Sequence, residues 1–150
     1  METVILGIGW YIVFLLSSTV HEAAHALAAL KLGDRTAYHG GQVSIDPRPH
    51  IRQQPFGMIV VPILTFFLSG WMMGWASVPY DPLWAQRYPN RSAVMSLAGP
   101  AANLSLVMIA GILIRVGMLL GWFHAPDLIN FTHVTAVTPD MPSFFNGLAT

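Results

Sequence analysis

Two histidines and a glutamate near the start of the chain have the spacing of a zinc site. The string His21-Glu22-Ala23-Ala24-His25 reads H-E-x-x-H. Four positions on a helix amount to just over one turn, so both imidazoles lie on one face and can bind a single metal ion. Glu22 lies about 100° round the helix from His21, near enough to act as a base on water at that metal. We therefore predict His21 and His25 as zinc ligands and Glu22 as a catalytic residue in hydrolysis.

The alternative for the same five residues is the solvated polar face of a surface helix. Their neighbours argue against it, because residues 3–20 contain no charge and residues 23–30 are apolar apart from His25. A charged side chain at the centre of a membrane helix costs roughly 2.5–3.5 kcal/mol on insertion scales, so such residues are functional by default. This setting favours the metal site.

The composition indicates a membrane protein. Of 150 residues, 54% are hydrophobic and only 9% are charged, whereas ordinary soluble domains have about 25% charged residues. Seven basic and seven acidic residues balance, so we expect the lipid bilayer and no nucleic acid as a partner. Cysteine is absent, which excludes disulfides, thiolate ligands and a cysteine nucleophile.

Three stretches are long and apolar enough to cross a bilayer, which needs about 20 residues. They are residues 3–32, residues 53–80 with kinks at Pro62 and Gly70, and residues 92–114 with an extension to Trp122. A fourth apolar pattern begins at Pro142. We predict an all-α membrane protein, a bundle of three transmembrane helices plus the start of a fourth, forming a single domain over residues 1–150.

The loop after the first span has the pattern of a short β-hairpin or edge strand. Gly40-Gly41 is a turn signal, and Val43 and Ile45 alternate with polar residues. Such a strand, over residues 42–46, could receive an unwound substrate by strand addition, or it could only cap the bundle. Both alternatives stay open.

Basic residues predict the orientation. The loop after the metal helix contains Lys31, Arg35, Arg48 and Arg52, and with alternating spans Arg87 and Arg91 lie on the opposite side. The positive-inside rule then makes the first group cytoplasmic and places the metal site in the cytoplasmic half of the membrane.

The third span opens with Ala98-Gly99-Pro100-Ala101-Ala102-Asn103. Its small residues form a narrow helix face, which alone is more typical of helix packing than of catalysis. Asn103 on that face adds an amide that can stabilise an oxyanion, so we predict it as a second catalytic residue.

HEAAH, AGPAAN and the intervening G-x-V-x-I-D-P-x-P-H-I string together resemble the site-2 protease family (peptidase M50), in particular its short prokaryotic members. The resemblance implies a multi-pass zinc metalloprotease of the cell membrane that cuts transmembrane substrates near the cytoplasmic side, using water at the zinc activated by Glu22. It assigns the zinc ligands to His21 and His25 and matches Asn103 to the asparagine of the G-x-x-x-N motif. His50 matches a histidine of the short members that has no assigned role.

One departure concerns the third zinc ligand, which the family takes from an aspartate in a later N-x-x-P-x-x-x-L-D-G or N-P-D-G pattern. Neither pattern occurs here, and Asp140 in Pro139-Asp140-Met141 is a poor substitute. We expect the last helix to be missing, which would leave this chain inactive alone. Two rival functions remain: a non-catalytic relative that binds transmembrane segments, and a membrane metal-binding or transport protein.

Overall fold

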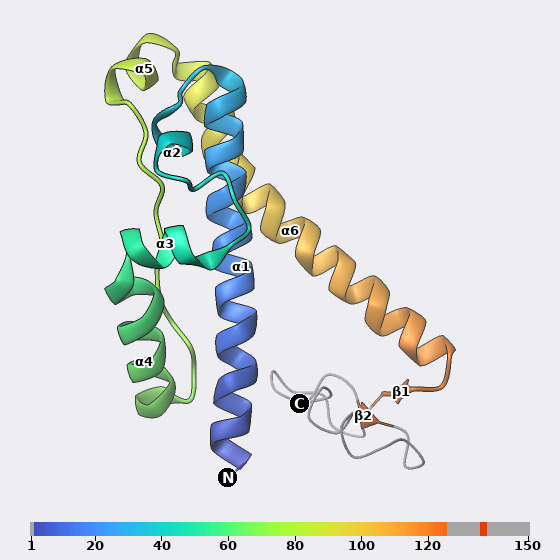
Figure 1. The fold of residues 1–150 in the computed structure, drawn as a ribbon. Coiled ribbons are helices and arrows are strands. Elements are labelled where there is room, and N and C mark those ends of the chain that lie inside the picture. The colour runs from blue at the N-terminus through green and yellow to red at the C-terminus, as the bar shows by residue number, and fades with distance from the viewer. Residues whose placement is uncertain (1, 126–135, 138–150) are drawn as a thin grey trace. The chain divides into compact units, whose positions relative to one another are not determined.

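The computed structural model describes residues 2–125 and 136–137, and most of these are helical (Figure 1). They fall into two compact units: Gly7–Ser105, and a second unit that includes the N-terminal residues before Gly7 and the chain from Leu106 onward. The first unit holds every predicted site residue that the structure describes. An all-α membrane protein is therefore the correct fold class, while the single domain stays a prediction.

Two long apolar helices, α1 (Glu2–Leu32) and α6 (Pro89–Leu119), correspond to the predicted first and third spans. Each has 31 residues, or about 46 Å at 1.5 Å per residue, and so exceeds a bilayer core of about 30 Å. Both are long and apolar enough to cross a membrane. Their excess length means that one end of each can project beyond the core.

The predicted middle span is a bent pair of helices. α3 (Pro47–Gln53) is followed by a π-helical turn, η1 (Phe56–Val60), which continues into α4 (Val61–Ser69). The two parts are bent by 114°. The bend falls at Gln54, whose backbone leaves the helical region, because the ring of Pro55 disfavours helical angles in the residue before it.

After α4 the chain turns back as an extended segment, residues 71–81 (Figure 1). Gly70 ends α4 with φ of 75°, a left-handed conformation that glycine adopts without steric cost. The segment ends where the Asp81 N–H donates to Asp34 Oδ2 at 2.9 Å, two residues beyond the end of α1. The prediction of one kinked helix over residues 53–80 is therefore wrong. The last third of this stretch is extended, and it brings the chain back to the end of α1.

The return segment lies close against η1. The Trp75 N–H donates to the Gly57 carbonyl at 3.1 Å. A Cβ atom at Gly57 would overlap the Trp75 carbonyl oxygen, so only glycine permits this approach.

The predicted hairpin or edge strand over residues 42–46 is wrong. The loop instead contains two short helices, α2 (Thr36–His39) and α3, with turns and bends between them. The Asp46 carboxylate caps α3 by accepting the Arg48 N–H at 2.9 Å, and Pro47 occupies the first helical position. This capping outweighs a short alternation of apolar residues.

The C-terminal end of α1 lies beside the beginning of α6. α5 (Pro82–Arg87) leads into α6, and Arg91 Nη1 donates to the Leu32 carbonyl at 3.1 Å. Arg91 is therefore on the same side as Lys31, which corrects the expectation that Arg87 and Arg91 face the other side. Ala29, Trp84 and Met95 form a small buried cluster here.

In the second unit, β1 (Phe123–His124) pairs antiparallel with β2 (Ala136–Val137). The predicted start of a fourth helix at Pro142 lies outside the described residues, as does Asp140.

Candidate metal centre

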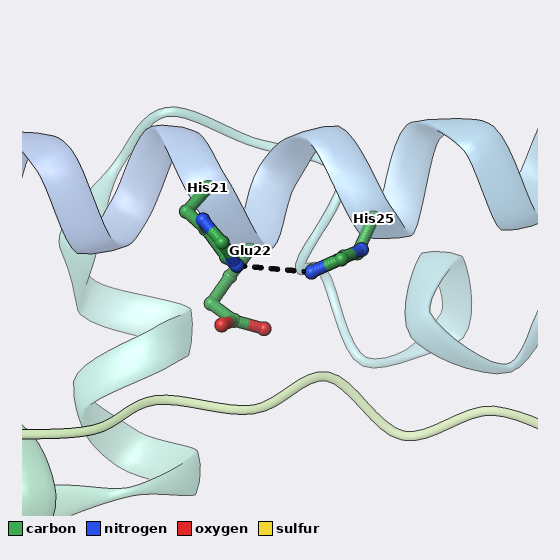
Figure 2. Close-up of side chains that lie close together, drawn as sticks. All are labelled: His21, Glu22 and His25. Carbon is green, nitrogen blue, oxygen red and sulfur yellow. Dashed lines mark hydrogen bonds between the residues drawn. The ribbon is translucent and has the colours of Figure 1, made fainter. Parts of the chain in front are cut away.

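The two histidines of α1 face one another at the distance that a shared metal requires (Figure 2). Their rings lie edge to face with centroids 4.7 Å apart, and the two Nε2 atoms are 3.1 Å apart. Two nitrogen ligands at about 2.05 Å from a tetrahedral zinc would be about 3.3 Å apart. The spacing fits zinc.

A backbone carbonyl fixes the tautomer of His25. Its Nδ1 lies 2.7 Å from the Met95 carbonyl oxygen, and since a carbonyl only accepts, Nδ1 must carry the hydrogen. In the neutral ring Nε2 then presents a lone pair toward His21. A histidine that ligates a metal typically donates its other N–H in this way.

Glu22 completes the group. Its side chain is 7% exposed, and ligand atoms of His21, Glu22 and His25 lie within 4.8 Å of one another. In Figure 2 it extends from the same side of α1 as the rings, where it can act on a molecule at the metal face.

The first half of α6 runs antiparallel to α1 along this face, and residues one helical turn apart on α6 contact it in succession. The Met95 carbonyl meets His25, and a Cβ built on Gly99 would lie 2.5 Å from His21 Nε2 and closer still to His25 Nε2. One turn further, Asn103 Oδ1 accepts the Ser17 hydroxyl at 3.4 Å. Positions 95, 99 and 103 therefore cover the metal face, and the missing Cβ of Gly99 lets the α6 backbone approach both imidazoles closely.

A polar cavity of about 250 Å³ opens at the site. It is lined by side chains of α1 and α6 and by the return segment: Ser17, Ser18, His21, Glu22, Gly74, Trp75, Ala76 and Asn103. Asn103 accepts through Oδ1, and its Nδ2 has no hydrogen-bond partner among the described residues. An amide donor is therefore available beside the carboxylate of Glu22.

The return segment has one edge that is hydrogen-bonded to other parts of the chain and one edge, at Gly74 and Ala76, that has no backbone hydrogen bond to the described residues. Met73 exchanges hydrogen bonds with the Thr65 hydroxyl, and the Ser77 carbonyl accepts Gln42 Nε2 at 3.3 Å. Because backbone groups alternate along an extended chain, Gly74, Ala76 and Val78 turn theirs the other way. Gly74 and Ala76 line the cavity, so this edge follows it.

The structure thus gathers all four predicted site residues: His21, Glu22, His25 and Asn103. Sequence reasoning missed the return segment as a lining of the site. The sequence signal for an extended segment is the string Gly74-Trp75-Ala76-Ser77-Val78-Pro79, which has two β-branched or aromatic residues and ends at a proline. The predicted helix over residues 53–80 includes this string.

Comparisons with known proteins agree with the metal site. The chain is 34% identical over 99 residues, 65% of its length, to a Bacillus subtilis protein provisionally named zinc metalloprotease YwhC. It is 33% identical over 117 residues, 78% of its length, to a Mycobacterium tuberculosis protein provisionally named zinc metalloprotease Rip2. Each match covers 41% of the relative, so the chain spans about two fifths of their length.

No family model and no solved structure matches the chain. These relatives bear out the family resemblance that the HEAAH and AGPAAN motifs indicate. They support a site-2 protease-like family for the chain.

Proposed function

We propose that this chain forms the metal-binding part of an intramembrane zinc metalloprotease that hydrolyses peptide bonds of transmembrane proteins. The observation that carries the proposal is the pair of Nε2 atoms 3.1 Å apart, with Glu22 beside them, in a helix long and apolar enough to cross a membrane. A buried carboxylate in such a helix is costly unless it has a function.

His21 and His25 would hold the zinc, which when bound supplies a Lewis acid and lowers the pKa of water toward about 7. Glu22 takes a proton from the attacking water and delivers it to the leaving amine nitrogen. The free Nδ2 of Asn103 donates to the oxyanion that forms at the scissile carbonyl. The third protein ligand that catalytic zinc usually has is proposed to come from outside the described residues.

Hydrolysis inside a membrane needs water, and the cavity has the lining to hold it. Non-helical backbone at membrane depth is tolerated only where protein buries it or where it borders water. The return segment is such backbone, and Ser17, Ser18 and Asn103 add polar groups around the same cavity. Water can therefore reach Glu22 while the outer faces of α1 remain apolar.

The edge of the return segment at Gly74 and Ala76 is the proposed seat of the substrate. A transmembrane helix must unwind before its carbonyls can be attacked, and pairing with Gly74 and Ala76 would replace the hydrogen bonds it loses. This edge takes the role we had expected of residues 42–46. N-methylation of successive peptide-substrate residues should raise KM at every second position, whereas uniform effects would contradict strand pairing.

We propose that the end of α1 nearest the site is cytoplasmic. Lys31, Arg35 and Arg91 gather there, since Arg91 donates to Leu32, and basic residues mark the cytoplasmic side. Placing Arg91 in this group increases the charge bias on which the orientation depends.

The decisive experiment is Glu22→Gln in the complete gene product, reconstituted with a membrane-spanning peptide. We expect zinc to be retained and cleavage to be abolished. Cleavage by the Glu22→Gln protein would refute the mechanism. Bound peptide without any product from the wild type would indicate a non-catalytic relative, and altered zinc flux without product would indicate a transporter.

A further inference from the structure

Trp84 on α5 has a buried hydrogen-bond donor without an acceptor. The side chain is 7% exposed and packs with Ala29 and Met95 in the small cluster between α1 and α6. Its indole Nε1–H is buried, and no acceptor pairs with it among the described residues. An unpaired buried donor is costly, and native proteins have few of them. The indole N–H therefore calls for an acceptor that the described residues do not supply.

This N–H shares a small space with the guanidinium group of Arg91. A Cβ atom built on Gly33 would lie 3.7 Å from Trp84 Nε1 and 3.8 Å from Arg91 Nη1, so both donors lie around the glycine. Gly33 and Arg91 are exposed, which places the indole nitrogen just beneath the surface. Gly33 has φ of 108°, which favours glycine and keeps this space without a side chain.

Basic side chains surround the space. The Cζ atoms of Arg87 and Arg91 lie 5.5 Å and 4.5 Å from the centroid of the Tyr88 ring. Neither arginine forms an ion pair within the described part of the chain. Lys31 is the neighbour of Leu32, whose carbonyl accepts Arg91 Nη1 at 3.1 Å. Arg91 Nη2 and Nε therefore remain as donors for a ligand.

The acceptors in this part of the chain already have partners. Asp34 Oδ2 accepts the Asp81 N–H at 2.9 Å, and Asp81 Oδ1 accepts the Leu83 N–H at 2.8 Å. The Leu32 carbonyl, at the negative end of α1, accepts from Arg91. Unused donors and positive charge thus meet at one place, which is the requirement for binding an anion.

We propose that Trp84 and Arg91 form a binding site for a phosphate group, and that the occupant is the headgroup of an anionic phospholipid. Its place in the fold selects a lipid. α1 ends at Leu32 and α6 begins at Pro89, so the site lies where two candidate membrane spans end (Figure 1). Basic pockets between transmembrane helices bind anionic headgroups at this level. The proposal goes beyond the proposed protease function and does not depend on it.

Native mass spectrometry of the complete gene product in detergent micelles would measure the Kd of the first bound phosphatidylglycerol. Phosphatidylcholine with the same acyl chains is the comparison, and we expect it to bind more weakly. Trp84→Phe keeps an aromatic ring and loses the N–H, and Arg91→Gln loses the charge. Each should weaken phosphatidylglycerol binding about 10-fold, as expected for a lost hydrogen bond to a charged group. Arg91→Gln, at an exposed side chain, keeps the test available if Trp84→Phe does not fold.

Two matched controls separate a site from general attraction. Arg35→Gln removes one exposed charge just after the same end of α1, and Trp122→Phe removes an exposed indole beyond the other end of α6. Trp122→Phe should bind as the wild type does, and Arg35→Gln should lose much less affinity than Arg91→Gln.

Three results would overturn the proposal. Equal losses in Arg35→Gln and Arg91→Gln would indicate diffuse attraction to basic charge, and wild-type affinity in Trp84→Phe would exclude the indole N–H. Inorganic phosphate is the third probe. If it binds with the same dependence on Trp84 and Arg91, while phosphatidylglycerol has no advantage over phosphatidylcholine, the site takes free phosphate and the lipid assignment is wrong.

Discussion

Gly99→Ala is the sharpest test of the metal centre, because one added methyl group would enter the space between the imidazoles. A Cβ at this position lies 2.5 Å from His21 Nε2 and 2.7 Å from His21 Cδ2, and it overlaps His25 Nε2. Ordinary van der Waals contact begins at 3.4 Å. Either α6 or the rings must therefore move by about 1 Å.

A displacement of this size is large for a metal site. Ligand distances are held within about 0.2 Å, and changes to outer-shell partners alone cost about 10–100-fold in affinity. Because the methyl group acts directly on both Nε2 atoms, we expect zinc to bind at least about 100-fold more weakly. Overpacking costs about 1–3 kcal/mol and replacing a helical glycine by alanine regains about 1 kcal/mol, so the apo protein should still fold.

Zinc affinity would be measured by competition with a chromophoric chelator, using the complete gene product in detergent micelles. Gly111→Ala is the matched control, since it lies on the same helix and its Cβ would meet nothing within 4 Å. It should bind zinc as the wild type does. Unchanged affinity in Gly99→Ala would show that the metal does not lie between α1 and α6.

Two further substitutions test the surroundings of the site. Asn103→Ala removes an amide donor from the cavity and should lower kcat about 10²–10³-fold with zinc binding unchanged; kcat equal to that of the wild type would exclude Asn103 from the reaction. At Asp34, burial raises the pKa, but hydrogen bonds from Thr36 and the Asp81 N–H outweigh burial, so the pKa of the carboxyl group lies below its ordinary value. The carboxylate therefore stabilises the fold above about pH 4, and this contribution is lost as pH falls through the folded-state pKa. Asp34→Asn should lower Tm at pH 7 but much less near pH 2, and an equal loss at both pH values would contradict this account.

The parts of the site that could be predicted from sequence are those set by residue spacing within a single helix. The spacing of His21 and His25 places two rings on one face of any helix, and α1 begins within one residue of the predicted start. Asn103 was found because it follows Gly99 by one turn on a face of small residues. These relations are local, so they need no knowledge of how the chain returns.

The return of residues 71–81 could not be predicted from hydropathy. An apolar composition indicates that a segment lies in an apolar environment. The composition is the same whether the segment crosses a membrane or enters and leaves on one side. The error at residues 42–46 was avoidable, since Asp46-Pro47 is a stronger helix-start signal than two alternating apolar residues are a strand signal. His50 was noticed, but only packing shows that it is buried, with its Nε2 next to the Ser44 carbonyl.

The antiparallel register of α1 and α6 links the separate parts of the site. His25 meets position 95, both imidazoles meet position 99, and Ser17 meets position 103. Three successive turns of α6 thus supply a carbonyl that fixes a tautomer, a glycine that permits close approach to both imidazoles, and an amide. Because one helix carries all three, separating it from α1 would remove the partner of His25 Nδ1 and the proposed oxyanion donor together. If the proposed function is correct, we therefore expect metal binding and catalysis to be coupled through the packing of these two helices.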